Sequence, residues 1–172
     1  MKSAKSNLGK ERIVWHYTAG TNHFQGILGD RVIKLSTILV DRGERPAVWF
    51  SQSPLWERTA TVDRYWSIRP TEVMLEEMLE EMLSDGIPLM RIAVLETTAP
   101  VRWKDFKRTS GISFLTAKSL EKSAYDNGSN PWLWRCSFAP VPFDDWVSVE
   151  VYQRIGWTDT GILKGLRERM TG

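Results

Sequence analysis

The sequence predicts an α+β domain built on a split, largely antiparallel β-sheet with short flanking helices. Roughly six apolar segments have strand length, and the helical segments between them are few. Several strand segments are aromatic and half polar, whereas strands buried in a parallel sheet are apolar throughout. With 172 residues, 42% of them hydrophobic, the chain is predicted to form a single domain over residues 13–172.

Residues 1–12 are polar and basic, and we expect them to form a flexible tail. No run approaches the roughly 18 apolar residues of a membrane span, and no apolar stretch follows the tail as in a secretory signal. We therefore expect a cytoplasmic protein without membrane contact. Cys136 is the single cysteine, and one cysteine with two histidines is a poor set of zinc ligands, so we expect no metal.

The first half of the chain is predicted to begin strand, helix, strand, strand, over residues 13–18, 21–30, 31–37 and 47–51. The helix is indicated by apolar residues at helical spacing, and each strand by an apolar or alternating run. Pro54 suits a first helical turn, which predicts a further helix over residues 55–66.

Residues 71–85 form the clearest predicted helix. Its apolar side chains make one stripe, consisting of Val73, Met74, Met78, Leu79, Met82 and Leu83. Six acidic and no basic side chains lie between Glu72 and Asp85, while the rest of the chain carries 23 basic and 15 acidic side chains. We expect the stripe to face the sheet and the carboxylates to face water, away from any anionic ligand. The basic remainder fits an anionic ligand or an ordinary solvated surface.

The second half is predicted to contain a strand, a helix, two strands and a terminal helix, over residues 88–96, 116–128, 132–139, 146–152 and 162–170. In the 132–139 strand, alternation places four residues on one face: Trp132, Trp134, Cys136 and Phe138. In the last strand it directs Val147, Val149 and Val151 to the core. The other face of that strand then carries Trp146, Ser148, Glu150 and Tyr152.

Three of the apolar strands expose polar groups together with aromatic ones. His16 lies in the first strand and is followed at once by a helix, Ser51 ends the strand at 47–51, and Glu150 lies in the last strand. Nine tryptophans are well above ordinary usage, and we expect some of them to line a cleft. A histidine, an aromatic and hydroxyl shelf and a carboxylate from distant segments could together bind one ligand.

These segments resemble the ADP-ribosyltransferase-like superfamily in its His-Tyr-Glu branch, the diphtheria-toxin-, PARP- or DarT-like group. The stretch VWHYTAGTNHFQGILGDRVIKLST at 14–37 is similar to the opening of that family, and RPAVWFSQSPLW at 45–56 is similar to its middle motif. WVSVEVY at 146–152 resembles its glutamate-bearing strand. The resemblance implies the split antiparallel fold and NAD-dependent transfer of ADP-ribose to a macromolecular acceptor, either protein or nucleic acid.

The resemblance also implies residue roles. Glu150 would bind the ribose 2′-hydroxyl and stabilise the oxocarbenium-like transition state, and His16 would act with it. NAD contacts are expected from His16, Tyr17, Thr18, Trp49, Phe50 and Ser51. Of these, the aromatic residues would stack on nicotinamide and Ser51 would support Glu150, so that His16, Ser51 and Glu150 line one cleft. The ordinary alternatives are a core histidine and a solvent-facing strand carboxylate.

Ser148 stands where the resembled family has Glu or Gln, two residues before Glu150, which disfavours an arginine acceptor and leaves the acceptor open. Two other functions stay possible on this fold. One is a non-catalytic, tryptophan-rich domain that binds protein or nucleic acid. The other is an NAD-dependent RNA 2′-phosphotransferase-like enzyme, although its basic pocket residues have no match here. The sequence contains no phosphate-binding GxxxxGK loop and neither of the hydrolase motifs GxSxG and HExxH.

Overall fold

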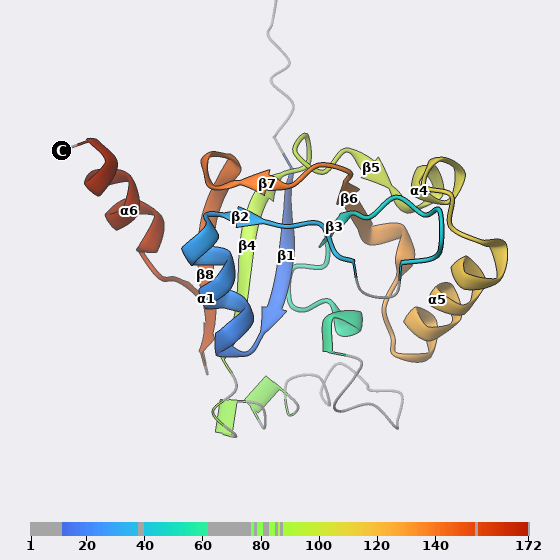
Figure 1. Ribbon diagram of the computed structural model, residues 1–172. Helices are drawn as coiled ribbons and strands as arrows, with labels where there is room; N and C mark the ends of the chain where they lie inside the picture. Colours follow the sequence, from blue (N-terminus) through green and yellow to red (C-terminus); the bar gives the residue numbers. More distant parts are fainter. Residues whose placement is uncertain are drawn as a thin grey trace, which may run out of the picture.

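The computed structural model describes residues 12–37, 40–61, 77, 79–80, 83–84, 86, 88–153 and 155–171. Seven of its strands form one sheet in the order β5-β6-β3-β1-β4-β8-β9 (Figure 1). They are β1 (Ile13–Ala19), β3 (Val48–Ser51), β4 (Leu89–Leu95), β5 (Val101–Arg102), β6 (Trp134–Ser137), β8 (Trp146–Gln153) and β9 (Gly156–Asp159). β2 (Val32–Ile33) and β7 (Val141–Pro142) form a second, two-stranded sheet. Every pairing of the described strands is antiparallel, so the α+β, antiparallel prediction is confirmed.

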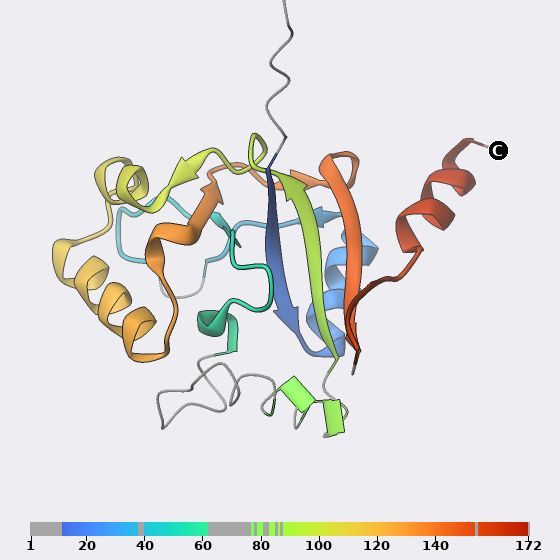
Figure 2. The ribbon, with the colours of Figure 1, turned by 180° about the vertical axis from the view of Figure 1, so that it is seen from behind.

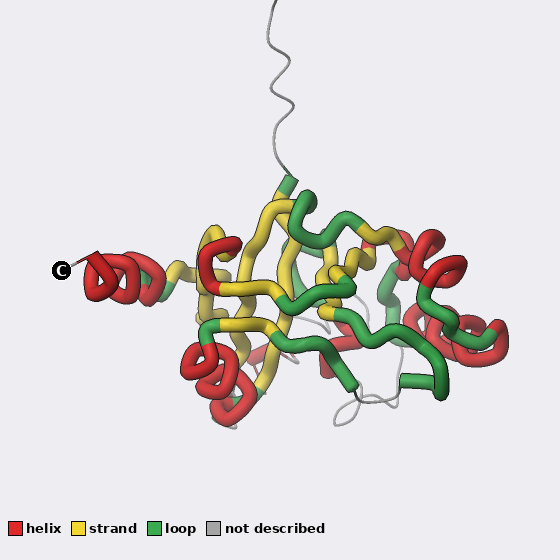
Figure 3. Tube along the Cα trace, turned by 45° about the horizontal axis from the view of Figure 1, so that its top comes forward, coloured by secondary structure: helices red, strands yellow, loops and turns green. Residues whose placement is uncertain are grey.

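Four α-helices are described along their whole length: α1 (Thr21–Asp30), α4 (Trp103–Thr109), α5 (Phe114–Asp126) and α6 (Ile162–Thr171). α1 and the β2–β7 sheet cover one face of β1, β4 and β8, as Figures 1 and 2 show from opposite sides. α4 and α5 lie together at one end of the molecule. Figure 3 shows the strands between this end and the end that carries the C-terminus.

The two faces of the central strands bury different side chains because successive residues of a strand point in opposite directions. We call one the α1 face, defined by Val14, His16 and Thr18 of β1, which packs on α1 and the small sheet. The opposite face is defined by Trp15 and Tyr17. Around β1 this face packs against the segment after β3. On the other side of β3, around β6, it packs against α4 and α5. This division decides which candidate residues can meet.

Tryptophan is used mainly for packing. Of the eight described tryptophans only Trp132 is exposed, with 56% of its surface accessible. Trp56, Trp103 and Trp146 are almost completely buried, and the others are buried or half-buried. The high tryptophan count is therefore explained largely by the cores on the two faces, not by a tryptophan-lined cleft.

A β-bulge in β8 changes the predicted division of its side chains. Ser148 pairs with Ala93 of β4, and Trp146 pairs with the next residue, Val94, so Val147 between them has no partner in β4. The bulge turns Trp146 into the α1-face core beside Val149 and leaves Val147 exposed. The prediction that Val147 is core and that Trp146 shares the face of Ser148 is therefore wrong.

The helix predicted from Pro54 does not begin there. The chain stays irregular up to a 3₁₀ turn, η1 (Arg58–Thr61). Serine side chains bond locally in this stretch: Ser51 Oγ accepts from the Ser53 amide at 3.1 Å, and Ser53 Oγ donates to the Trp56 carbonyl at 3.0 Å. Such bonds compete with helical ones. The rest of this predicted helix, residues 62–66, lies outside the described residues.

β6 begins later than predicted. Residues Pro131–Leu133 form a 3₁₀ turn, η2, whose start is capped by Asn130 Oδ1 accepting from the Trp132 amide at 3.1 Å. Trp132 consequently leaves the face that Trp134 and Cys136 share and points to solvent.

The described residues of the predicted 71–85 helix, which are 77, 79–80 and 83–84, are helical. Leu79 is fully buried and Leu83 packs with it in the cluster around Tyr17, as the apolar stripe predicts. The two described glutamates of this segment are exposed. Its other residues and most of the predicted tail, residues 1–11, lie outside the described residues. No helix in the described part of the chain has the length and apolarity to cross a bilayer.

Candidate functional site

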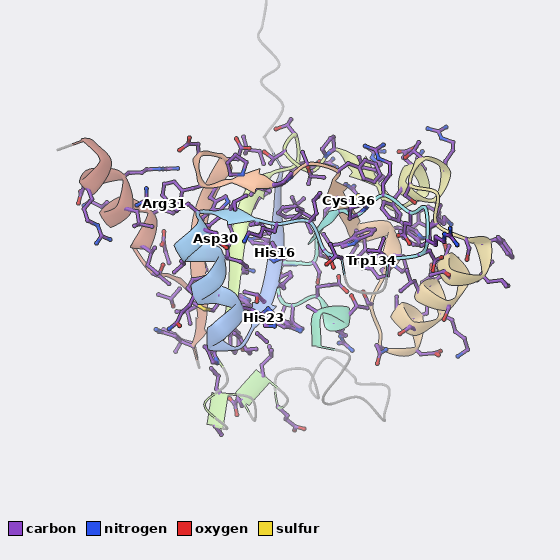
Figure 4. All side chains as sticks on the ribbon, viewed as in Figure 1. His16, His23, Asp30, Arg31, Trp134 and Cys136 are labelled. Carbon is purple, nitrogen blue, oxygen red and sulfur yellow. The ribbon has the colours of Figure 1, made fainter. Side chains whose placement is uncertain are left out.

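His16 projects from the middle of β1 onto the α1 face (Figure 4). Its Nδ1 lies 2.9 Å from the carbonyl oxygen of Trp49, and its ring meets Phe50 edge-on with the centroids 5.8 Å apart. Because a carbonyl oxygen only accepts, Nδ1 carries the proton and Nε2 of the neutral ring is an acceptor. Among the described residues, Nε2 has no hydrogen-bond partner.

The position of His16 favours its neutral ring. Burial lowers the pKa of His16 below its ordinary value of 6.5, and the hydrogen bond to the Trp49 carbonyl only partly offsets this effect. The side chain is therefore a neutral imidazole near pH 7, with its tautomer fixed and with one acceptor that no described residue uses. Such a group is suited to accept a hydrogen bond from a ligand hydroxyl.

Two further predicted NAD contacts share the α1 face with His16. Thr18 lies two residues along β1, and Phe50 lies across from His16 on β3; both are buried. Phe50 is only 3% exposed and belongs to the core, so it orients His16 and is not available to stack on nicotinamide.

Glu150 projects from β8 onto the opposite face. In the ladders that join β1, β4 and β8, His16 aligns with Val149, and Glu150 is one residue further along. Neighbouring residues of a strand point to opposite sides, so His16 and Glu150 lie on different faces of the sheet. The prediction that His16, Ser51 and Glu150 line one cleft is therefore wrong.

Both oxygens of the Glu150 carboxylate are engaged within the sheet. Oε2 accepts from Arg91 Nε at 2.7 Å and lies 2.5 Å from Arg91 Nη2. Oε1 accepts from Ser148 Oγ at 2.5 Å. The side chains of Arg91 and Glu150 are only 10% and 16% exposed. The negative charge of Glu150 is thus compensated by a nearly buried guanidinium.

Aromatic rings enclose the Arg91 guanidinium. Its central carbon lies 4.8 Å from the ring centre of Trp15 and 4.5 Å from that of Trp157, within cation–π range. Nη1 donates to the carbonyl oxygen of Pro54. Arg91 therefore connects four adjacent elements, β1, β4, β8 and β9, with the segment that follows β3. This network is typical of a structural ion pair.

Ser51 lies on the face of Glu150 but does not contact it. Their strands are separated by β1 and β4, a distance of about 14 Å across the sheet. Ser51 Oγ instead donates to Glu57 Oε2 at 2.7 Å. Glu57 is buried, and its other oxygen accepts from Thr59 Oγ1 at 2.7 Å and from the Ser129 hydroxyl. The support predicted for Glu150 is thus given to Glu57, which sequence reasoning missed.

Tyr17 and Trp49, two predicted stacking residues, also serve packing. The Tyr17 hydroxyl donates to the Ser53 carbonyl, and its ring lies edge-on to Trp56 with the centroids 4.9 Å apart. Burial raises the pKa of Tyr17 above its ordinary value of 10.0. Trp49 contacts Phe106 of α4 at a centroid distance of 4.6 Å. Both rings lie on the face opposite His16.

A second polar cluster, also missed from the sequence, lies at the ends of β3 and β4. Arg135, which aligns with Phe50 in the β3–β6 ladder, donates from Nε to Glu96 Oε1 at 2.9 Å and from Nη2 to Gln52 Oε1 at 3.0 Å. Gln52 Nε2 also donates to Glu96 at 3.3 Å. Arg135 is buried and the side chain of Glu96 is 22% exposed. By strand alternation Gln52 lies on the α1 face, two residues beyond Phe50.

No protein-family model matches the chain, and searches of curated proteins and of solved structures give no match either. Function therefore has to be argued from the residues themselves. Among the described residues, no three His, Cys, Asp or Glu side chains gather in a way that could hold a metal ion. On the α1 face, His16 has an acceptor with no partner among the described residues, and Gln52 bonds to the Arg135–Glu96 pair. On the opposite face, the carboxylates Glu57 and Glu150 have internal partners.

Proposed function

We propose that this chain binds an NAD-type dinucleotide at the α1 face and uses it to transfer ADP-ribose to a macromolecular acceptor. The observation that supports this proposal is the state of His16. Its Nδ1–H is held by the Trp49 carbonyl, and its Nε2 is left as an acceptor. A ribose hydroxyl is a donor of the right kind for that acceptor. The sequence resemblance around residues 14–37 gives the same role to this histidine.

Glu150 is assigned a different role from the one implied by the resemblance. Cleavage of the nicotinamide–ribose bond needs an ionised carboxylate within a few ångströms of the sugar. Glu150 is on the far side of the sheet from His16 and is paired with Arg91. We assign it to sheet stability. Glu96 is also ion-paired, with Arg135, but by strand alternation it lies on the α1 face with His16, and it is the carboxylate we propose to test for catalysis.

Calorimetric titration with NAD tests the binding step. In His16→Gln the side-chain amide lies near the position of Nε2, so its oxygen can still accept a hydrogen bond there. In His16→Asn the amide reaches only the position of Nδ1, where its NH₂ group can still donate to the Trp49 carbonyl, and no acceptor remains near Nε2. We expect affinity to fall in the order wild type, Gln, Asn, with a total loss of about two- to tenfold, the worth of one hydrogen bond. His23→Asn, at an exposed position on α1, is the matched control and should bind like wild type. Equal affinity of the wild-type and His16→Asn proteins would refute the proposal.

Release of nicotinamide from NAD tests the transfer step. We expect release by the wild type, its loss in Glu96→Gln and its retention, per folded molecule, in Glu150→Gln. Loss in Glu150→Gln, with Glu96→Gln unaffected, would return the catalytic role to Glu150.

A non-catalytic binding domain is the second candidate function, and one observation favours it. Two described carboxylates in or next to the implied motifs, Glu57 and Glu150, are both satisfied by internal partners and lie on the face away from His16. This alternative predicts NAD binding that depends on His16 without any nicotinamide release. The two assays together therefore separate an enzyme from a binding domain.

A further inference from the structure

The surface formed by α4, α5 and η2 exposes aromatic rings that the rest of the described chain buries. Phe114 is 73% exposed, Trp132 is 56% exposed and Tyr125 is 44% exposed. Phe114 and Tyr125 belong to one stripe of α5, at i and i+11, and α5 and η2 are neighbours. Isolated exposed rings are ordinary, but three rings on adjacent elements form a patch.

Lysines connect these rings into one continuous surface. Lys118 Nζ lies 5.8 Å from the ring centre of Phe114, and Lys107 Nζ lies 5.8 Å from that of Trp132. Glu121 lies between the two lysines, with Nζ–carboxylate distances of 2.5 Å to Lys107 and 3.9 Å to Lys118. From the start of α5 to η2 the patch therefore runs in the order ring, cation, carboxylate, cation, ring.

Glu121 organises this surface. Its Oε1 accepts from Trp103 Nε1 at 2.8 Å as well as from Lys107, so it fixes α5 against α4. The hydrogen bond from Lys107 lowers the pKa of Glu121, despite the opposing effect of partial burial. The carboxylate stays ionised and holds Lys107 beside Trp132. The ammonium group and the indole ring are therefore close enough to contact the same ligand.

The charge of this end of the molecule favours an anionic partner. Residues 101–134 carry six basic and three acidic side chains, a surplus of three that exceeds the net charge of +2 of the whole chain. Arg102 at the end of β5 and Lys104 and Arg108 on α4 are exposed. Exposed rings interleaved with cations are the features that bind unpaired bases and phosphates together.

We propose that the α4–α5–η2 surface binds single-stranded nucleic acid, with Trp132, Phe114 and Tyr125 stacking on bases and Lys107 and Lys118 contacting phosphates. The stripe from Phe114 to Tyr125 is about 16 Å long, which accommodates a few nucleotides. A duplex keeps its bases stacked on one another and cannot offer their faces to the rings. An acidic protein segment would use the lysines but would leave the rings without stacking partners. This surface is separate from His16, and the inference does not rest on NAD binding.

Fluorescence anisotropy with labelled single strands of about 15 nucleotides tests the proposal, using the full chain at about 50 and 200 mM salt. Trp132→Ala should weaken binding about tenfold, the loss expected for one stacked base. Lys118→Ala should weaken binding and reduce the slope of log affinity against log salt by about 0.7, the value for one phosphate contact on a single strand. Both positions are exposed, and circular dichroism will show whether the fold is retained.

Matched controls lie at the other end of the molecule. Ile155→Ala removes an apolar side chain that is 91% exposed, and Lys164→Ala removes an exposed cation on α6. Both should bind like wild type, and a duplex of the same sequence should bind more weakly than the single strand. Three results would overturn the proposal: no binding at the lower salt, the same loss in Lys164→Ala as in Lys118→Ala, or equally tight binding of a glutamate-rich peptide that displaces the strand.

Discussion

Removing the charge of Glu150 should lower the free energy of unfolding of the protein. In Glu150→Gln the Arg91 guanidinium keeps its aromatic neighbours and the Pro54 carbonyl but loses its anionic partner. Breaking a buried ion pair by removing one member typically costs about 3–5 kcal/mol because a buried charge is left uncompensated. The side chains here are 10% and 16% exposed, so we expect about 3 kcal/mol. For a chain of this length, the melting temperature should fall by about 6–12 °C.

The assay is urea unfolding followed by tryptophan fluorescence, in a double-mutant cycle with Arg91→Met. The double variant Arg91→Met/Glu150→Gln should be more stable than the sum of the single effects predicts, by at least about 2 kcal/mol, because no buried charge is left unpaired. Asp126→Asn breaks the exposed pair with Lys122 and should cost at most about 0.5 kcal/mol. A cost in Glu150→Gln as small as in Asp126→Asn would refute the structural role of Glu150.

Three further predictions concern the other buried groups and the acidic helix. The pKa of His16 is lowered on folding, so the unfolded chain binds more protons and the free energy of unfolding should fall as pH drops below about 6.5. Urea unfolding of His16→Gln should show a smaller fall over the same pH range, and a pH profile identical to that of the wild type would contradict this. Ser51→Ala should cost about 1–3 kcal/mol in the same assay because buried Glu57 loses a donor, whereas the exposed Ser119→Ala should be neutral. Replacing the four glutamates at 76, 77, 80 and 81 with glutamine should leave calorimetric NAD affinity equal or higher at low salt, and a marked loss would place that helix in the site.

Local periodicity was sufficient to predict the elements that frame the site. β1, α1, β3 and β4 lie close to their predicted positions because an apolar run or a helical stripe is a property of neighbouring residues. The bulge at Val147 could not be predicted in this way. It is set by the pairing of β8 with β4, which brings together segments more than 50 residues apart.

The candidate site depended on the same long-range information. Alternation within β8 correctly grouped Ser148 with Glu150, but only the register through β4 determines that this group faces away from His16. The partner of Glu150, Arg91, lies 59 residues earlier in the sequence and had no local signal. Glu57 did have one: it follows Ser51 by six residues in a short segment rich in hydroxyl groups.

The most direct test of the central claim is long-range ¹H–¹⁵N NMR of the imidazole rings, because the chain has only two histidines. We predict that His16 near pH 7 is neutral, with the proton on Nδ1 and an unprotonated Nε2. Addition of NAD should then shift the Nε2 resonance of His16 and leave the exposed His23 unchanged. A proton on Nε2 of His16, or a spectrum unaltered by saturating NAD, would contradict the account.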